Sequence, residues 1–66
     1  MLKTRLNELR TLKGMSQDEL ANIVGVRRET ILRLEKGLYN PSLKLAMDIA
    51  KVFNKSVEEV FEFVDN

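Results

Sequence analysis

Residues 16–37 place capping, small and apolar residues at spacings that fit two short helices joined by a tight turn. Ser16 and Glu19, three residues apart, fit a capping box at the start of a helix over residues 17–24. Gly25 fits a left-handed cap at the end of that helix, because glycine adopts positive φ without steric cost. This segment therefore predicts a helix with defined ends, followed by a turn.

A second helix is predicted over residues 28–36, ending at Gly37. Ile31 and Leu34 give this helix an apolar face. The preceding helix has its own apolar stripe, formed by Leu20, Ile23 and Val24. Two helices joined by a short turn that contains glycine form a helix-turn-helix, whose second helix suits the DNA major groove.

The same residues resemble a known family. The pattern S-Q-x-x-L-A-x-x-x-G-V-x-x-x-x-I-x-x-x-E-x-G is met at every fixed position of residues 16–37. It resembles the phage-repressor and Cro-type (XRE-like) helix-turn-helix family of transcriptional regulators. The later stretches Y-N-P-S-L-x-L-A-x-x-I-A-x-x-F and E-E-V-F are similar to its very short members, including the cytolysin-repressor type. Arg27 departs from the pattern, since many relatives carry Ser or Thr there as an N-cap.

The segments on either side of this motif predict further helices. A first helix is expected over about Arg5–Lys13, ended by Gly14. Its apolar spacing comes from Leu6, Leu9 and either Leu12 or Lys13. After a connection over residues 38–41, Ser42 fits the N-cap of a strongly apolar helix. The stripe of that helix contains Leu43, Ala46, Met47, Ala50 and Phe53, widened by Leu45, Ile49 and Val52.

The end of the chain predicts one more helix and a strand. Asn54 fits a left-handed cap, and Ser56 with Glu59 fits a second capping box for a short helix near residues 57–61. The tail F-E-F-V alternates as a strand does, and L-K-T-R near the start is its expected partner. The predicted fold class is all-α: a five-helix repressor-like DNA-binding bundle with a short two-stranded sheet from the N- and C-termini.

Length and composition limit what this chain can do. Its 66 residues fit a single domain over residues 1–66, with a core so small that self-association is the expected support. The absence of Cys and His removes disulfides, zinc sites, thiol catalysis and imidazole chemistry. We therefore expect no enzyme activity, no cofactor or metal, and no small-molecule site.

Charge and hydropathy indicate the compartment and the partner. No apolar run is long enough to span a bilayer, and the first ten residues lack a signal-peptide core. A cytoplasmic location is expected, with nucleoid association when the protein is bound. Residues 1–37 contain eight basic and five acidic residues, whereas residues 38–66 contain three and five. The first part should attract a polyanion, although a mixed soluble surface explains the charges equally well.

The second helix of the motif carries the expected base-reading residues. At 100° per residue, Glu29, Leu32, Arg33 and Lys36 lie opposite the core face, and Arg28 lies on its flank. The expected base contacts are Arg28, Glu29, Leu32 and Arg33. Arginine can form a fork with guanine, glutamate can accept from cytosine, and leucine can touch a thymine methyl. Alternatively, Glu29 and Arg33 bridge each other as an i,i+4 pair, and Leu32 packs in a bundle or dimer contact.

The resemblance implies several contacts to the DNA backbone. The residues concerned are Gln17, Arg27, Thr30, Lys36, Tyr39 and Asn40. Such contacts position a protein on the duplex without reading its sequence. Gln17 can instead be an ordinary exposed residue, Thr30 can bond within its helix, and Tyr39 can pack into the core or a dimer seam.

The resemblance also implies a structural ion pair between Arg10 and Glu35 that joins the first helix to the second helix of the motif. For self-association, the expected seam is formed by Val57, Val60, Phe61 and Phe63, with Tyr39 and Asn40 as further candidates. Alternatively, the seam's apolar side chains complete the core of a single chain.

The function predicted is that of a sequence-specific regulator of double-stranded DNA, acting as a repressor and bound to an inverted repeat as a homodimer. One alternative is the antitoxin of a toxin–antitoxin pair, although such proteins usually hold the toxin with an added tail. Another is a protein-interaction module without a DNA role, for which Arg28 and Arg33 would be dispensable.

Overall fold

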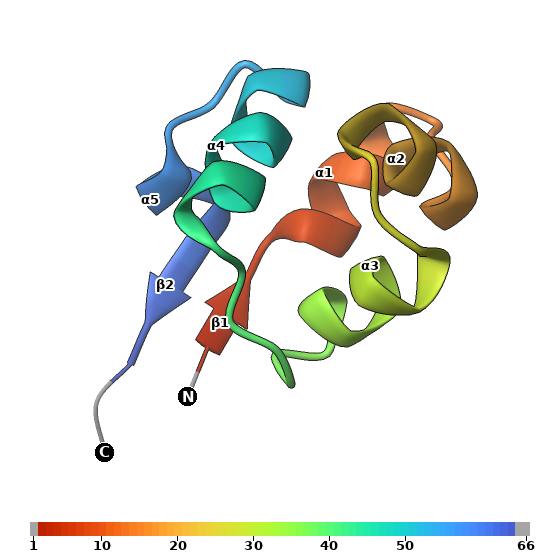
Figure 1. Cartoon of the computed structure of the whole chain (residues 1–66). Coiled ribbons are helices and arrows are strands. Elements are labelled where there is room, and N and C mark those ends of the chain that lie inside the picture. The colour runs from red at the N-terminus through yellow and green to blue at the C-terminus, as the bar shows by residue number, and fades with distance from the viewer. Residues whose placement is uncertain (1, 65–66) are drawn as a thin grey trace.

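The computed structural model describes residues 2–64 and contains five helices and one two-stranded sheet (Figure 1). In chain order the elements are β1 (Leu2–Thr4), α1 (Leu6–Leu12), α2 (Gln17–Val24), α3 (Arg28–Glu35), α4 (Leu43–Val52), α5 (Val57–Val60) and β2 (Phe61–Phe63). The predicted fold class is confirmed, and each helix lies within about two residues of its expected bounds.

The predicted capping residues define where the helices begin and end. Ser16 accepts a hydrogen bond from the backbone N–H of Glu19, and the Glu19 carboxylate accepts one from the backbone N–H of Ser16. Ser56 and Glu59 form the same reciprocal box at α5. These bonds lower the pKa of both glutamates, with the backbone bond as the larger cause.

Three other helix ends differ in how they are satisfied. Gly25 takes the left-handed conformation with φ of 75° after α2, and Asn54 takes it with φ of 54° after α4. At the start of α3, Arg27 occupies the N-cap position without forming a side-chain cap hydrogen bond. Arg27 stands where many relatives carry Ser or Thr, and the start of α3 therefore has no side-chain cap.

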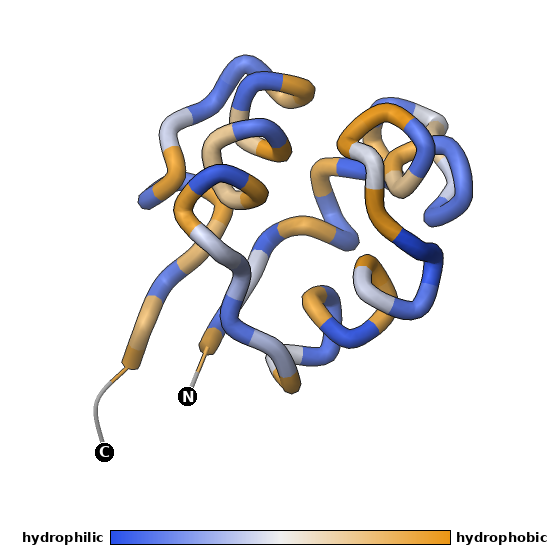
Figure 2. The backbone as a smooth tube through the Cα atoms, in the orientation of Figure 1, coloured by the Kyte–Doolittle hydropathy of each residue, from blue (hydrophilic) through white to orange (hydrophobic). Residues whose placement is uncertain are grey.

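The core lies where all five helices and the sheet meet. Its fully buried large side chains are Leu6, Leu20, Ile31, Leu34, Ile49 and Val60. The apolar helix α4 contributes a stripe of four buried residues, Leu45, Ala46, Ile49 and Ala50. The helix-turn-helix is thus packed against α1, which contacts α3, and against α4, which contacts α2. Figure 2 shows hydrophilic residues where α3 begins.

Four apolar residues expected on the helices' apolar stripes are exposed instead: Leu12, Ile23, Leu43 and Met47. Their expected burial is therefore wrong. Each lies at the edge of its helix's buried face or at the end of its helix, where no neighbouring element covers it. When a helix is short and few elements pack against it, only part of a wide apolar stripe is buried.

The expected sheet is present, and it joins the two ends of the described chain. β1 and β2 are antiparallel, with Leu2 opposite Phe63 and Thr4 opposite Phe61. Arg5 continues the pairing, because its backbone N–H donates to the Val60 carbonyl at 2.9 Å. In the part of the chain that the structure describes, no helix has the length and apolar character needed to cross a bilayer.

Gly37 provides a test of how tightly the end of α3 is packed against β1. It has φ of 73°, and a Cβ built on it would lie 2.5 Å from the Leu2 carbonyl oxygen. Gly14 has a similar φ of 67° but open space around it. We expect Gly14→Ala to reduce the free energy of unfolding by about 1 kcal/mol through strain alone. Gly37→Ala should cost about 2–4 kcal/mol, because the backbone of β1 must also move.

Urea unfolding of the two variants and the parent chain measures this difference. Equal losses for the two alanine variants would show that the contact between Gly37 and β1 is unimportant.

Candidate nucleic-acid interface

The helix α3 has one face in the core and the opposite face in solvent. Ile31 and Leu34 are fully buried and fix the rotation of the helix about its axis. The residues expected to read bases, Arg28, Glu29, Leu32 and Arg33, are all exposed. In Figure 1, α3 lies on the side of the molecule away from β2 and α5. A helix presented in this way can enter a major groove.

The polar side chains of this face are nearly free of contacts within the chain. Arg28 forms a long ion pair with Asp18 of α2, in which Nε and Oδ1 are 3.9 Å apart. Within residues 2–64, the structure contains no ion pair between Glu29 and Arg33. The alternative interpretation of these two residues as a surface pair is therefore not the arrangement found. Leu32 is only partly exposed, so it contributes a limited apolar area to the face.

An ion pair shielded from water joins α3 to α1. The Arg10 Nε donates to Glu35 Oε2 at 2.6 Å, and Arg10 Nη2 donates to Glu35 Oε1 at 3.2 Å. The pair is shielded from water, with 14% of the Arg10 side chain and 6% of the Glu35 side chain exposed. Arg10 Nη1 also donates to the Met15 carbonyl at 2.8 Å. The ion pair implied by the resemblance thus joins α1, α3 and the loop before α2.

Two amide side chains complete the shell around Glu35. Asn7 Nδ2 and Gln17 Nε2 each donate to Glu35 Oε1 at 3.1 Å. Gln17 is the first residue of α2 and is half-buried. Its side-chain amide is therefore engaged within the chain by Glu35. Asn7 was not anticipated from the sequence. Its position one helical turn before Arg10 is the signal that could have identified it.

This shell determines the ionisation of the pair. Burial raises the pKa of Glu35, but the hydrogen bonds from Arg10, Asn7 and Gln17 and the charge of Arg10 together lower it below its ordinary value. The hydrogen bond to Glu35 in turn raises the pKa of Arg10. The pair is therefore charged at neutral pH and links three helices of the bundle.

The remaining residues expected at the DNA backbone lie around α3. Arg27, Lys36, Tyr39 and Asn40 are exposed, whereas Thr30 is half-buried. Tyr39 lines an open hollow of about 280 Å³ between the α2–α3 turn and the start of α4. It therefore lies at the surface near the motif and is not a core residue.

The expected dimer seam needs correction. Val60 and Phe61 are buried in the chain's own core, with 1% and 3% of their surfaces exposed. They are therefore unavailable to a second copy, and the alternative in which they complete the core of one chain holds for them. Val57 is half-buried against the same core. Phe63 differs, because 60% of its surface is exposed.

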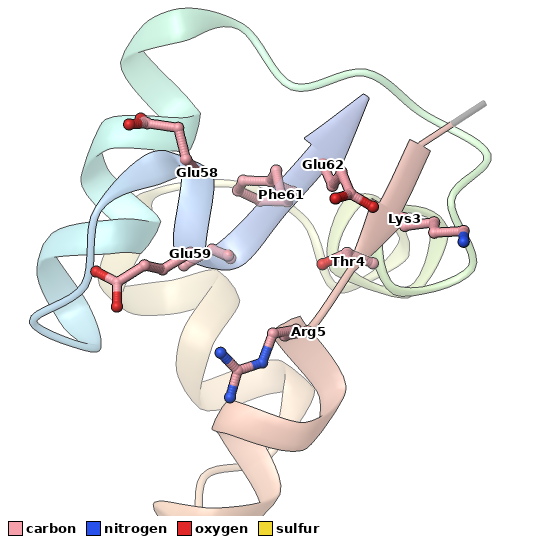
Figure 3. A pocket seen from close by; sticks show the side chains of 8 residues that line it. Lys3, Thr4, Arg5, Glu58, Glu59, Phe61 and Glu62 are labelled. Carbon is pink, nitrogen blue, oxygen red and sulfur yellow. The ribbon is translucent and has the colours of Figure 1, made fainter. Parts of the chain in front are cut away.

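A second hollow, of about 340 Å³, lies at the opposite end of the molecule and is shown in Figure 3. It lies between the end of β1 and the α5–β2 segment. Its lining carries both signs of charge, from Lys3, Arg5, Glu58, Glu59 and Glu62. Figure 3 shows the charged ends of Lys3 and Glu58 pointing away from each other.

Comparison with known proteins gives one consistent result. A family model described as helix-turn-helix matches residues 6–60. An uncharacterized HTH-type transcriptional regulator of Archaeoglobus fulgidus is 59% identical over 64 residues, which cover 97% of this chain and 91% of that protein.

Two characterised proteins add detail. The cryptic phage CTXphi transcriptional repressor RstR of Vibrio cholerae is 32% identical over 60 residues, covering 91% of this chain and 54% of the repressor. The crystal structure of SinR, the master regulator for biofilm formation, in complex with DNA has a TM-score of 0.73 and 33% identity. That match covers 82% of this chain and 87% of the SinR chain.

The Glu35 shell predicts a pH-dependent contribution to stability. Glu35→Gln should lower the free energy of unfolding at pH 7 by about 2–4 kcal/mol, because it leaves Arg10 shielded from water without a counter-charge. The pKa of Glu35 is lower in the folded state than in the unfolded state. The stabilisation is therefore complete above about pH 4.3, the ordinary pKa of glutamate, and is lost as the pH falls through the folded-state pKa.

Urea unfolding from pH 7 to pH 2 should thus show the parent and Glu35→Gln curves converging in acid. The exposed Glu58→Gln variant is the control and should track the parent chain throughout. A gap for Glu35→Gln that stays constant with pH would mean that the charge of Glu35 is not its source.

Proposed function

Because this chain belongs to the helix-turn-helix family of DNA-binding transcriptional regulators, we propose that it is a sequence-specific repressor that binds an inverted repeat as a homodimer. The observation that carries this proposal is the orientation of α3. Ile31 and Leu34 hold one face of the helix in the core, and two arginines and a glutamate project from the other face. It is not an enzyme.

The base-reading roles follow from the chemistry of the exposed face. Arg28 and Arg33 each offer a guanidinium fork that matches guanine O6 and N7. Glu29 accepts from cytosine N4 and repels phosphate, so it favours discrimination over general affinity. Leu32 offers a smaller contact to a thymine methyl. Each good bidentate pair contributes about 1–3 kcal/mol of discrimination between bases.

The backbone contacts are proposed for residues that surround α3. Gln17 holds Glu35 with its amide nitrogen, which leaves its second amide hydrogen for a phosphate oxygen. Arg27, with no helix-capping hydrogen bond, and Lys36 flank α3 at its two ends and fit phosphates on either side of the groove. Thr30, Tyr39 and Asn40 are the further candidates. These contacts fix register and leave sequence discrimination to the face of α3.

A homodimer needs a seam that leaves both copies of α3 free on the same side. Gly37 follows α3 and touches Leu2, and Leu2 pairs with Phe63, so this end of the sheet lies beside the loop after α3. The loop residues Leu38 and Tyr39 are exposed, as is Phe63. We therefore propose a revised seam of Phe63, Leu38 and Tyr39, with Asn40 at its edge. To read an inverted repeat, such a dimer must hold its two α3 helices about 34 Å apart, one turn of DNA.

Repression then requires only that the dimer occupy a promoter and exclude the polymerase. The similarity to a phage transcriptional repressor supports this sign of regulation over activation. We propose the cytoplasm as the place of action, because the DNA target is there. Selection of bound sequences from a random duplex pool tests the proposal directly. Enrichment of a palindrome is expected, and recovery of unrelated sequences would refute sequence-specific binding.

Arg33 tests the reading of bases. Arg33→Ala should reduce the preference for the selected site over random duplex by about tenfold, the size of one good base contact. Lys36→Ala, at the end of the same helix, is the matched control and should weaken binding to both duplexes alike. Fluorescence anisotropy at one fixed salt concentration gives the six dissociation constants of the parent chain and the two variants on the two duplexes. A uniform loss for Arg33→Ala would remove it from the base-reading set.

Phe63 tests the seam. Phe63→Ser should shift the chain toward monomer by at least tenfold in dissociation constant, because it removes an exposed aromatic side chain that has no role in the chain's own core. Leu12→Ser is the control, since Leu12 is also exposed but lies in the last turn of α1. Sedimentation equilibrium across concentrations measures both. If Phe63→Ser remains dimeric, the seam lies elsewhere.

A further inference from the structure

The two helices of the motif share one charged contact at the end that would enter the groove. Asp18, in the first turn of α2, has its Oδ1 atom 3.9 Å from Nε of Arg28, the first residue of α3. Both side chains are largely exposed, Asp18 at 71% and Arg28 at 63%. An ion pair this exposed stabilises a fold very little. The pair therefore matters less for stability than for its location beside the base-reading face.

We propose that Asp18 is a specificity-determining residue that positions Arg28 for base reading, an inference that rests on the proposed function. The carboxylate approaches the Nε edge of the guanidinium, so the Nη1 and Nη2 atoms remain available for a fork with guanine O6 and N7. Holding one edge of the guanidinium limits the directions in which the other edge points. When the groove excludes water, the attraction between Asp18 and Arg28 strengthens, because the local dielectric falls.

The charge of Asp18 has a second effect. Binding to DNA of any sequence depends mainly on neutralising phosphates. A carboxylate at the edge of the DNA-binding surface opposes this term on every duplex. On the correct sequence, the aimed contact of Arg28 offsets that repulsion, whereas on other sequences nothing does. The charge of Asp18 thus weakens binding to every duplex, and its positioning of Arg28 supplies the preference for the correct sequence.

A purely structural role for Asp18 would give a different result. An acidic residue in the first turn of α2 interacts favourably with the positive end of the helix. Glu19 does the same and also closes the capping box. If Asp18 acted only in this way, its removal would change the unfolding midpoint and leave discrimination between DNA sequences intact.

The experiment uses the duplex selected from a random pool by the full chain. Dissociation constants are measured for that duplex, for random duplex, and for every single base-pair substitution within one half-site. The variants are Asp18→Asn, Asp18→Glu, Arg28→Ala, the double variant Asp18→Asn/Arg28→Ala, and the control Glu58→Gln. The control removes the same charge from exposed Glu58 on α5, which lies away from α3 in Figure 1. Urea unfolding of each variant accompanies the binding data.

We expect Asp18→Asn to tighten binding to random duplex by about threefold and to lose about tenfold in preference for the selected site, the scale of one base contact. The loss should fall at the same base pair that Arg28→Ala affects, and the double variant should lose no more there than Arg28→Ala alone. Asp18→Glu should restore part of the preference, and Glu58→Gln should leave it unchanged.

Three results would overturn the inference, and they are distinguishable. If the parent chain selects a site but Asp18→Asn behaves as Glu58→Gln does, Asp18 has no positioning role and the proposed function stands. If Asp18→Asn and Arg28→Ala affect different base pairs or add in the double variant, the coupling is refuted. A parent chain that selects no sequence at all would refute the proposed function, and this inference with it.

Discussion

The carboxylate of Glu35 is the polar centre on which the DNA-reading arrangement depends. It receives hydrogen bonds from Arg10, Asn7 and Gln17, and so ties α3 to α1 and to the start of α2. A charge pair shielded from water is unfavourable unless its hydrogen bonds are complete, which makes the arrangement sensitive to geometry. Apolar contacts from Ile31 and Leu34 hold α3 against the core, and the Glu35 shell sets how α3 and α2 lie relative to each other.

This shell also connects the fold to DNA contact. Gln17 donates to Glu35 and begins the helix that is proposed to grip the phosphate backbone. A change in Glu35 would therefore disturb both the position of α3 and the proposed backbone contact of Gln17. The outer face of α3, by contrast, has only one ion pair with the rest of the described chain, between Arg28 and Asp18. The proposed base-reading surface is thus separated from the interactions that hold the fold.

Local sequence signals predicted the helices and their ends well, but they predicted less well which side chains are exposed. The capping boxes at Ser16 and Ser56, and the glycine after α2, act within a few residues and do not depend on the rest of the fold. Burial depends on what lies opposite. The sequence alone left Phe61 and Phe63 as equivalent seam candidates, yet Phe61 is buried in the core and Phe63 is exposed. Side chains alternate along a strand, so Phe61 and Phe63 lie on the same face of β2, and only packing decides how far along that face the core extends.

The sequence by itself determined the five helices, the tight turn between α2 and α3, and the chemical types available on the outer face of α3, because periodicity and capping are local properties. Only the tertiary structure decided that Asn7 and Gln17 surround Glu35, that Val60 and Phe61 serve the chain's own core, and that Asp18 lies beside Arg28. Those facts join residues that are distant in the chain. No local rule specifies them, since they follow from how the helices pack around a shared core.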